Sequence, residues 1–196
     1  LSDLEVSLLL GVGLPTRRYA KWDAAYDVGV YYSENNCLAT CTYDWVGAKS
    51  DIGLNRGKHY YEFEVAVAPW FSEGTFIGMC LEGTPLTNEI GLARSGTYYG
   101  HGPWKGCPCV RFSAAGKYTA YFNLVLLDSQ TASIIAAGDV FGFAVDFDNH
   151  RLDIYRNGTL TVSDMPLGRG IVYYPAFDYA HRVAVRANFG QAAFKY

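Results

Sequence analysis

Two glutamates in the stretch HYYEFEVAVA (59–68) have the residue type and spacing of a hydrolytic pair. On an extended strand, Glu62 and Glu64 share one face and lie about 7 Å apart by the strand rise. Hydrolysis of a glycosidic bond uses two carboxyl groups about 5–10 Å apart. The same spacing occurs on the solvent face of any strand, and no Glu-x-Asp-x-Glu arrangement follows. We therefore predict that both are solvated strand-face residues, with a carbohydrate-active enzyme as an alternative.

A second group of oxygen ligands, Asp146, Asp148, Asn149 and Asp153, invites comparison with a calcium loop. An EF-hand loop that began at Asp148 would need Gly at its sixth position and Glu at its twelfth. Those positions hold Asp153 and Thr159, so the pattern fails. Asp and Asn are common in turns because they tolerate the left-handed conformation and bond to the local backbone. The cluster therefore predicts a turn.

The chain has five cysteines, far fewer than a disulfide scaffold of this length would use. Cys37 and Cys41 would lie about 13 Å apart on a strand, too far to share one zinc ion. The spacing of Cys107 and Cys109, with one proline between them, is not that of a zinc knuckle. With Cys80, they are expected to be mostly buried thiols, although a disulfide between segments stays open.

Nucleophilic catalysis would require a serine or cysteine placed beside a histidine. The chain has no Gly-x-Ser-x-Gly elbow, and its histidines (59, 101, 150 and 181) are scattered without a familiar context. His59 begins a predicted strand and is expected to be a surface or edge residue. We predict a protein that is not an enzyme and that uses neither a cofactor nor a metal.

Composition places the chain among globular proteins. Its 196 residues suit one domain, and with 50% hydrophobic and 18% charged residues it is not a disordered chain. The net charge is −3 and the pI is near 5.8, and the only adjacent basic pair is Arg17-Arg18. Binding to nucleic acid by electrostatic attraction needs clustered basic residues, so that class of function is excluded.

No apolar run reaches the roughly 18 residues of a membrane span, so no membrane insertion is expected. The run VSLLLGV (6–12) is shorter and lacks the basic start and cleavage site of a signal peptide. Because the chain starts at Leu1 rather than Met, we expect it to be part of a larger or processed protein. Residues 1–19 are predicted to be a lead-in or the end of an upstream region, and 20–196 the domain.

Alternating apolar residues dominate the rest of the chain. In 59–68, Tyr61, Phe63, Val65 and Val67 point one way and the glutamates point the other, as in a half-buried strand. Helix patterns are scarce: residues 2–10 suit a short helix or an extended piece. Many short strands separated by turns predict an all-β sandwich or barrel. Further strands are expected at 75–81, 117–127, 140–147, 151–156, 159–162 and 183–189. The stretch 82–116 is expected to be a long loop or a loop with a small hairpin.

Residues 138–158 (GDVFGFAVDFDNHRLDIYRNG) predict two strands joined by a turn at Asp148-Asn149-His150. Asn157-Gly158 is the sequence that a type I′ turn prefers, because both of its central residues take positive φ. A return strand should follow. The predicted core face consists of Phe141, Phe143, Val145 and Phe147 in the first strand, and Leu152 and Ile154 in the second.

Six segments occur in an order that is typical of one family. They are Lys21-Trp22-Asp23, SENNCLA (33–39) with 48–54 and GKHYYEFEV (57–65), FIGM (76–79), the hairpin 138–158, Tyr174-Pro175-Ala176, and NFGQ (188–191) with Phe194. On these segments, about residues 20–196, the chain resembles the SPRY (B30.2-like) family. The resemblance implies an antiparallel, concanavalin A-like β-sandwich that binds ligands and does not catalyse. The stretch 100–116 departs from the family pattern.

The ending ANFGQAAFKY and the texture of residues 35–40 resemble SPRY domains of bacterial and phage proteins, and the PRY signature of tripartite-motif ligases is not found. The resemblance implies host-surface recognition or attachment by a tail fibre or other virion appendage, and hence an extracellular location. The alternative is a cytoplasmic adaptor that captures a peptide of a partner protein.

Aromatic residues in the predicted loops supply the candidate binding site. Their rigid rings with polar tips suit a protein or a surface glycan as the ligand. For any one of them, packing over an end of the sandwich is equally expected. The set comprises Trp70 and Phe71 between two strands, Tyr98, Tyr99, His101 and Trp104 in the long loop, and Tyr179 and His181 in a turn before the last strand.

Overall fold

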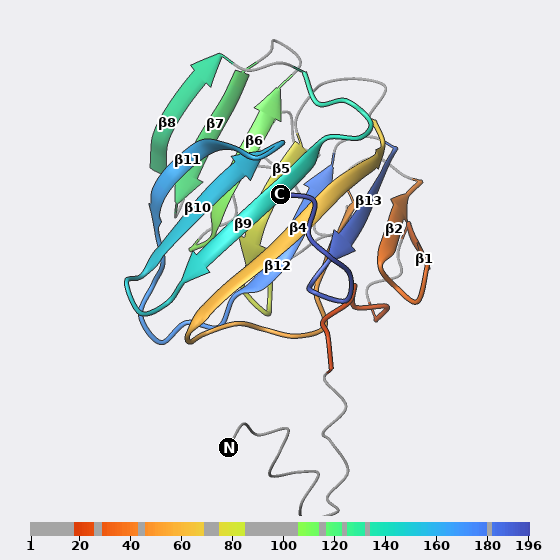
Figure 1. Ribbon diagram of the computed structural model, residues 1–196, viewed down its shortest axis with the longest axis horizontal. Helices are drawn as coiled ribbons and strands as arrows, with labels where there is room; N and C mark the ends of the chain where they lie inside the picture. Colours follow the sequence, from red (N-terminus) through yellow and green to blue (C-terminus); the bar gives the residue numbers. More distant parts are fainter. Residues whose placement is uncertain are drawn as a thin grey trace, which may run out of the picture.

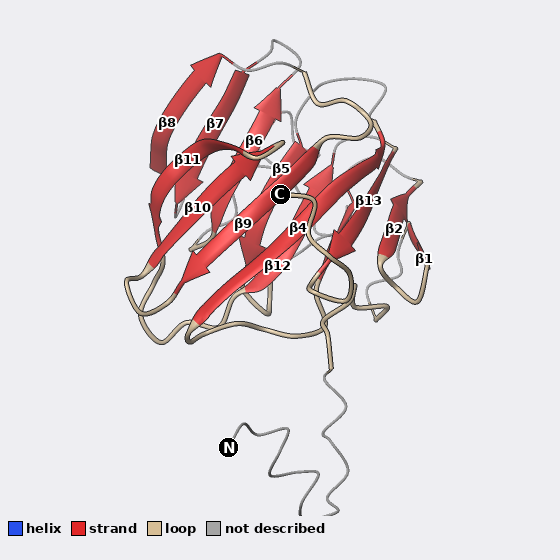
Figure 2. Cartoon of the chain, viewed as in Figure 1, coloured by secondary structure: helices blue, strands red, loops and turns tan. Residues whose placement is uncertain are grey.

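The described part of the chain is built from strands, with no helix among those residues (Figure 2). The all-β prediction is therefore confirmed. The computed structural model describes residues 18–25, 29–42, 46–68, 75–84, 106–113, 117–122, 125–131, 134–179 and 182–196. The predicted lead-in of residues 1–19 lies almost wholly outside these ranges, so the domain boundary stays a prediction.

Thirteen strands of the described residues form two antiparallel sheets that face each other (Figure 1). The seven-stranded sheet has the order β1 (Val30–Ser33), β2 (Leu38–Cys41), β13 (Val183–Asn188), β4 (Lys58–Val67), β9 (Val140–Asp146), β10 (Arg151–Arg156) and β11 (Thr159–Pro166). The six-stranded sheet has the order β3 (Val46–Lys49), β12 (Tyr174–Tyr179), β5 (Thr75–Cys80), β6 (Pro108–Ser113), β7 (Lys117–Phe122) and β8 (Val125–Thr131).

The core fills the space between the sheets, and the predicted alternation supplies it. Tyr61, Phe63 and Val65 of β4 are buried, and so are all six predicted core residues of β9, β10 and the turn between them. Val67 was predicted to face the same way but is 55% exposed. The reason is a register shift between β13 and β4 at Ala184, which interrupts the alternation before Val67 is reached.

Trp22 joins the two sheets. Its ring centroid lies 5.0 Å from that of Phe63 in the seven-stranded sheet and 5.1 Å from that of Phe177 in the six-stranded sheet. A third ring, Phe189, lies 5.7 Å away, edge-on, just after the last strand. The indole N–H of Trp22 donates a hydrogen bond to the Val185 carbonyl oxygen at 3.2 Å. This fully buried residue therefore connects the start of the described chain, both sheets and the C-terminal end.

The hairpin formed by β9 and β10 matches its prediction. Residues 147–150 form the turn, in which His150 has a φ of 55°. Asn157 and Gly158 have φ values of 51° and 77°, as a type I′ turn requires. The return strand is longer than predicted, because β11 continues past residue 162 to Pro166 through two register shifts against β10.

Three other strand predictions need correction. The single strand expected at 117–127 is two strands, β7 and β8, which pair antiparallel with Phe122 opposite Val125. Strand β6 lies inside the predicted loop 82–116 and pairs with β5 and β7. It begins at Pro108, and proline is tolerated at the first residue of a strand. Asp178 and Tyr179 belong to β12 rather than to a turn, since they pair with β3 and β5.

Replacing Phe63 by Ala is expected to lower the free energy of unfolding by about 3–5 kcal/mol, because the change removes a buried ring and leaves a cavity beside Trp22. Urea denaturation measures this. Tyr31→Ala is the control, because that ring in β1 is 67% exposed; its loss should change the free energy by no more than about 0.5 kcal/mol. A cost below about 1 kcal/mol for Phe63→Ala would contradict the core assignment.

Candidate functional site

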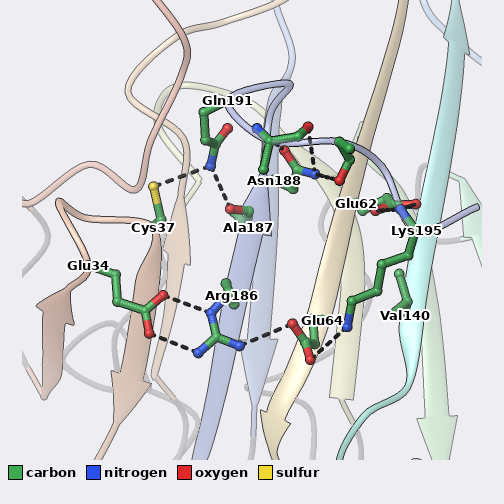
Figure 3. A pocket seen from close by; sticks show the side chains of 12 residues that line it. Glu34, Cys37, Glu62, Glu64, Val140, Arg186, Ala187, Asn188, Gln191 and Lys195 are labelled. Atoms are coloured by element: carbon green, nitrogen blue, oxygen red, sulfur yellow. Dashed lines mark hydrogen bonds and ion pairs between the residues drawn. The ribbon is translucent and has the colours of Figure 1, made fainter.

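The outer face of the seven-stranded sheet carries a cavity of about 350 Å³ (Figure 3). Its floor is formed by β13 and β4, and residues 188–195 close one side as the chain folds back over the sheet. The polar side chains that line it come from the β1–β2 turn, both floor strands and the terminal segment. They are Glu34, Cys37, Glu62, Glu64, Arg186, Asn188, Gln191 and Lys195.

Four charged side chains form a continuous chain of ion pairs across this face (Figure 3). Both carboxylate oxygens of Glu34 accept hydrogen bonds from the Arg186 guanidinium, at 2.7 and 2.8 Å. The third guanidinium nitrogen donates to Glu64 at 3.0 Å. The Lys195 ammonium lies 2.9 Å from the second oxygen of Glu64. Strands β13 and β4 and the β1–β2 turn are thereby tied to the terminal segment.

The ion pairs hold both carboxylates ionised. The hydrogen bond from Arg186 lowers the pKa of Glu34. The pKa of Glu64 is lowered chiefly by the hydrogen bond from Lys195, with Arg186 adding to the effect. A general acid for glycoside hydrolysis needs a raised pKa so that it carries a proton near neutral pH. Glu64 has the opposite shift and therefore does not suit that role.

Glu62 corrects the prediction of a solvated strand-face residue, because its exposed fraction is only 3%. The carboxylate accepts the backbone N–H of Lys195 at 2.9 and 3.1 Å and that of Tyr196 at 3.0 Å. Periodicity placed Glu62 correctly on the outer face. Alternation along one strand carries no information about a distant segment that covers that face, and so its burial was missed.

The acidic cluster beside the β9–β10 turn is structural, as predicted. The Asp146 carboxylate accepts the backbone N–H groups of Asp148 and Asn149 at 3.1 and 3.0 Å, and the Asn149 side-chain amide at 2.8 Å. Lys58 forms an ion pair with it at 3.2 Å. These contacts, led by the Asn149 amide, lower the pKa of Asp146 to about 2. The three hydrogen bonds close the turn, and the ion pair with Lys58 joins it to β4.

A second carboxylate, Asp139, fastens the other end of the same hairpin. It accepts hydrogen bonds from the Ala136 backbone, the Asn157 amide and the Arg156 guanidinium. Burial opposes ionisation, but these hydrogen bonds prevail and lower the pKa of Asp139. The Gly-Asp-Val and Tyr-x-Asn-Gly elements of the family hairpin therefore contact each other directly through Asp139 and Asn157.

All five cysteines lie within the described ranges, and no disulfide joins them there. Cys41, Cys80, Cys107 and Cys109 are buried, as expected. Burial raises the pKa of the Cys41, Cys80 and Cys107 thiols. Cys37 is half-buried beside the cavity, 3.3 Å from the Gln191 amide nitrogen. The described residues contain no cluster of three or more His, Cys, Asp or Glu side chains that would hold a metal ion.

The predicted loop site stays a prediction, because seven of its eight residues lie outside the described part of the chain. Trp70, Phe71, Tyr98, Tyr99, His101, Trp104 and His181 lie outside the described residues. Tyr179 is the last residue of β12, paired with Thr75 at the start of β5. The segment with Trp70 and Phe71 leads into that same end of β5, whereas the long loop leaves from Cys80, about 17 Å away by strand rise. The described strand ends next to these two segments therefore lie at opposite ends of β5.

Sequence patterns did not identify the charged residues of the outer face as a site. Glu34, Arg186 and Lys195 belong to three segments far apart in the chain, and isolated charges on alternating strands are ordinary. The segment AAFKY (192–196) was used only as a family marker. Its combination of small, aromatic and basic residues was the one available indication that it returns to the sheet.

The fold is similar to two SPRY domains of known structure. The crystal structure of the SPRY domain of human HERC1 matches with a TM-score of 0.62 at 15% identity, covering 88% of this chain and 99% of that one. The crystal structure of the TRIM65 PSpry domain matches with a TM-score of 0.62 at 14% identity, covering 96% and 99%. No protein-family model matches the sequence. No curated protein matches it either.

At these identities the likeness establishes the architecture, and the chain has a SPRY-like antiparallel β-sandwich. This confirms the fold predicted from the six ordered segments. The described residues include no helix long and apolar enough to cross a membrane.

Stability in acid is expected to depend on Asp146. Its folded pKa of about 2 lies below the ordinary value of 3.8, so the folded state binds fewer protons between these values. Its contribution is therefore full above about pH 5, shrinks below about pH 4 and is lost as the pH nears 2. Urea denaturation should show that the difference in the free energy of unfolding between the unmodified chain and Asp146→Asn becomes smaller as the pH falls from about 5 to about 2.

The control for this experiment is Asp148→Asn, since Asp148 is exposed and lies in the same turn. Its difference from the unmodified chain should stay near zero at every pH. A difference for Asp146→Asn that stayed constant down to about pH 2 would contradict a lowered pKa at that carboxylate.

Proposed function

We propose that this domain is a non-catalytic recognition module for a protein partner. The observation that carries the proposal is the backbone likeness to two SPRY domains over 99% of each of those chains, with a fold that was also predicted from ordered family segments. The described carboxylates add support, since Glu62, Glu64, Asp139 and Asp146 are all engaged in contacts within the sandwich. A carbohydrate-active enzyme would need such a pair free to act on a substrate.

The binding residues proposed are the aromatic residues of the connecting segments. Trp70, Phe71, Tyr179 and His181 form one group, and Tyr98, Tyr99, His101 and Trp104 form the other. Large aromatic side chains supply most of the affinity at many protein interfaces, because they bury much area with little loss of side-chain entropy. Since their anchors lie at opposite ends of β5, we propose that one group forms the centre of the interface.

Recognition of a host surface by a phage or virion appendage is the finer form of this proposal. It rests on the sequence texture of residues 35–40 and of the ending ANFGQAAFKY alone. In that setting the ligand would be a protein or glycan on the host surface. The alternative, an adaptor that captures a peptide inside the cell, draws on the same fold.

Peptides selected from a random display library on the folded domain are expected to lose affinity when one aromatic group is truncated. Either Trp70→Ala with Phe71→Ala, or Trp104→Ala, should weaken binding by about tenfold or more, as expected for an interface hot spot. Fluorescence anisotropy with the synthesised peptides measures the change, and the melting temperature should stay within a few degrees. Tyr31→Ala, on the exposed edge strand β1, is the control.

Two results would contradict the proposal. One is that no library peptide binds, or that neither set of changes alters binding. The other is a collapse of the melting temperature for both sets, which would show that these residues pack into the sandwich. A parallel glycan array separates the two ligand classes, because a protein-binding module should leave the array empty.

A further inference from the structure

The last three residues rest on the sheet in the way that a bound peptide does. No strand pairing joins residues 193–196 to either sheet in the described part of the chain. Instead, side chains of the outer face hold the segment, and its own aromatic side chains stay partly exposed: Phe194 is 39% exposed and Tyr196 60% exposed. The chain reaches this position by a turn after Phe189, in which the Asn188 amide donates to the carbonyl oxygens of Ala192 and Ala193.

The seat of this segment is the part of the outer face formed by Tyr60, Glu62, Glu64 and Gly158. Its first position is aromatic. The Phe194 ring meets the Tyr60 ring edge-on, with centroids 4.8 Å apart. Tyr60 itself lies over Gly142 of β9, where a Cβ would come within 2.2 Å of the tyrosine oxygen. Glycine at this point leaves room for the Tyr60 side chain over β9, where it meets the Phe194 ring.

The second and third positions take a lysine and another aromatic residue. Glu64 binds the Lys195 ammonium at 2.9 Å, and Glu62 binds two successive backbone N–H groups of the segment. The Tyr196 ring lies against Gly158, where a Cβ would come within 2.9 Å of a ring carbon. Together these contacts suit an aromatic–Lys–aromatic sequence whose two successive N–H groups both face Glu62.

Residues 194–196 can be released without leaving a buried polar group that lacks a hydrogen-bond partner. The segment contacts the Glu62 carboxylate through two N–H groups, and this carboxylate would be hydrated once the segment lifted away. The vacated face would then carry three carboxylates, Glu34, Glu62 and Glu64, against the single guanidinium of Arg186. This charge excess favours a basic incoming peptide.

We propose that this outer face is a docking site for an aromatic–Lys–aromatic segment of a protein partner, and that residues 194–196 occupy the site in cis. The partner segment would take the place of the chain's own residues. The seat is built on β4, β9 and the β10–β11 turn, apart from the loops proposed above. Failure of the loop variants and failure of this site are therefore distinguishable.

The test uses the full chain with Phe194→Ala, Lys195→Ala and Tyr196→Ala, which removes the three side chains from the seat and leaves only two backbone N–H groups to compete for Glu62. A fluorescein-labelled peptide AAFKY should bind this variant about tenfold or more tighter than it binds the unmodified chain, where the cis segment competes. The matched peptide AAFEY should bind the variant about tenfold or more weaker than AAFKY, because its carboxylate faces Glu64. Adding Glu62→Ala should abolish AAFKY binding.

Two results would overturn the proposal: the triple variant binds AAFKY and AAFEY equally, or it does not bind AAFKY. If the triple variant does not fold, 4-fluorophenylalanine at position 194 of the otherwise unmodified chain supplies the measurement. Excess AAFKY should move its fluorine resonance to the value of a free peptide, while AAFEY leaves it in place. An unmoved resonance, or a dimer formed by exchange of the segments between two copies, would also overturn the assignment to a partner peptide.

Discussion

The contact of Trp22 with the rings of Phe63, Phe177 and Phe189 is the constraint on which the rest of the structure depends. It ties the start of the described chain to both sheets and to the residue that follows the last strand. Because Phe189 is held against the core, the chain beyond it must turn, and Asn188 directs that turn over the outer face. The position of the terminal segment is thus a consequence of core packing.

Carboxylates on this domain serve as acceptors for backbone and side-chain donors. Asp146 and Asp139 fasten the two ends of one hairpin, and Glu62 fastens the terminal segment to the sheet. Where a pKa shift is resolved for these acidic groups, it is downward, which suits an ion that accepts hydrogen bonds and does not suit a proton donor. The geometry is therefore that of a scaffold that presents surfaces, in keeping with recognition.

Much of the fold could be predicted from local patterns. Alternation identified β4, β9, β10 and their core faces, and Asn157-Gly158 marked a turn that the structure confirms. The strands β1, β2 and β3 were missed because four residues are too few to show an alternating pattern, and β6 was missed because it begins within the Cys-Pro-Cys sequence. The outer-face site was missed because Glu34, Glu64 and Arg186 belong to segments far apart in the chain. They meet only through the pairing of strands in the seven-stranded sheet.

The central claim is that Glu62 holds residues 195 and 196 on the sheet through their backbone N–H groups. Amide hydrogen exchange followed by NMR tests it directly. In the unmodified chain both amides should exchange about tenfold or more slower than in an unstructured peptide, and Glu62→Ala should restore the unstructured rate. The Ala187 amide, bonded to the Cys37 carbonyl oxygen, should stay protected in both chains. Unstructured exchange rates for Lys195 and Tyr196 in the unmodified chain would contradict the claim.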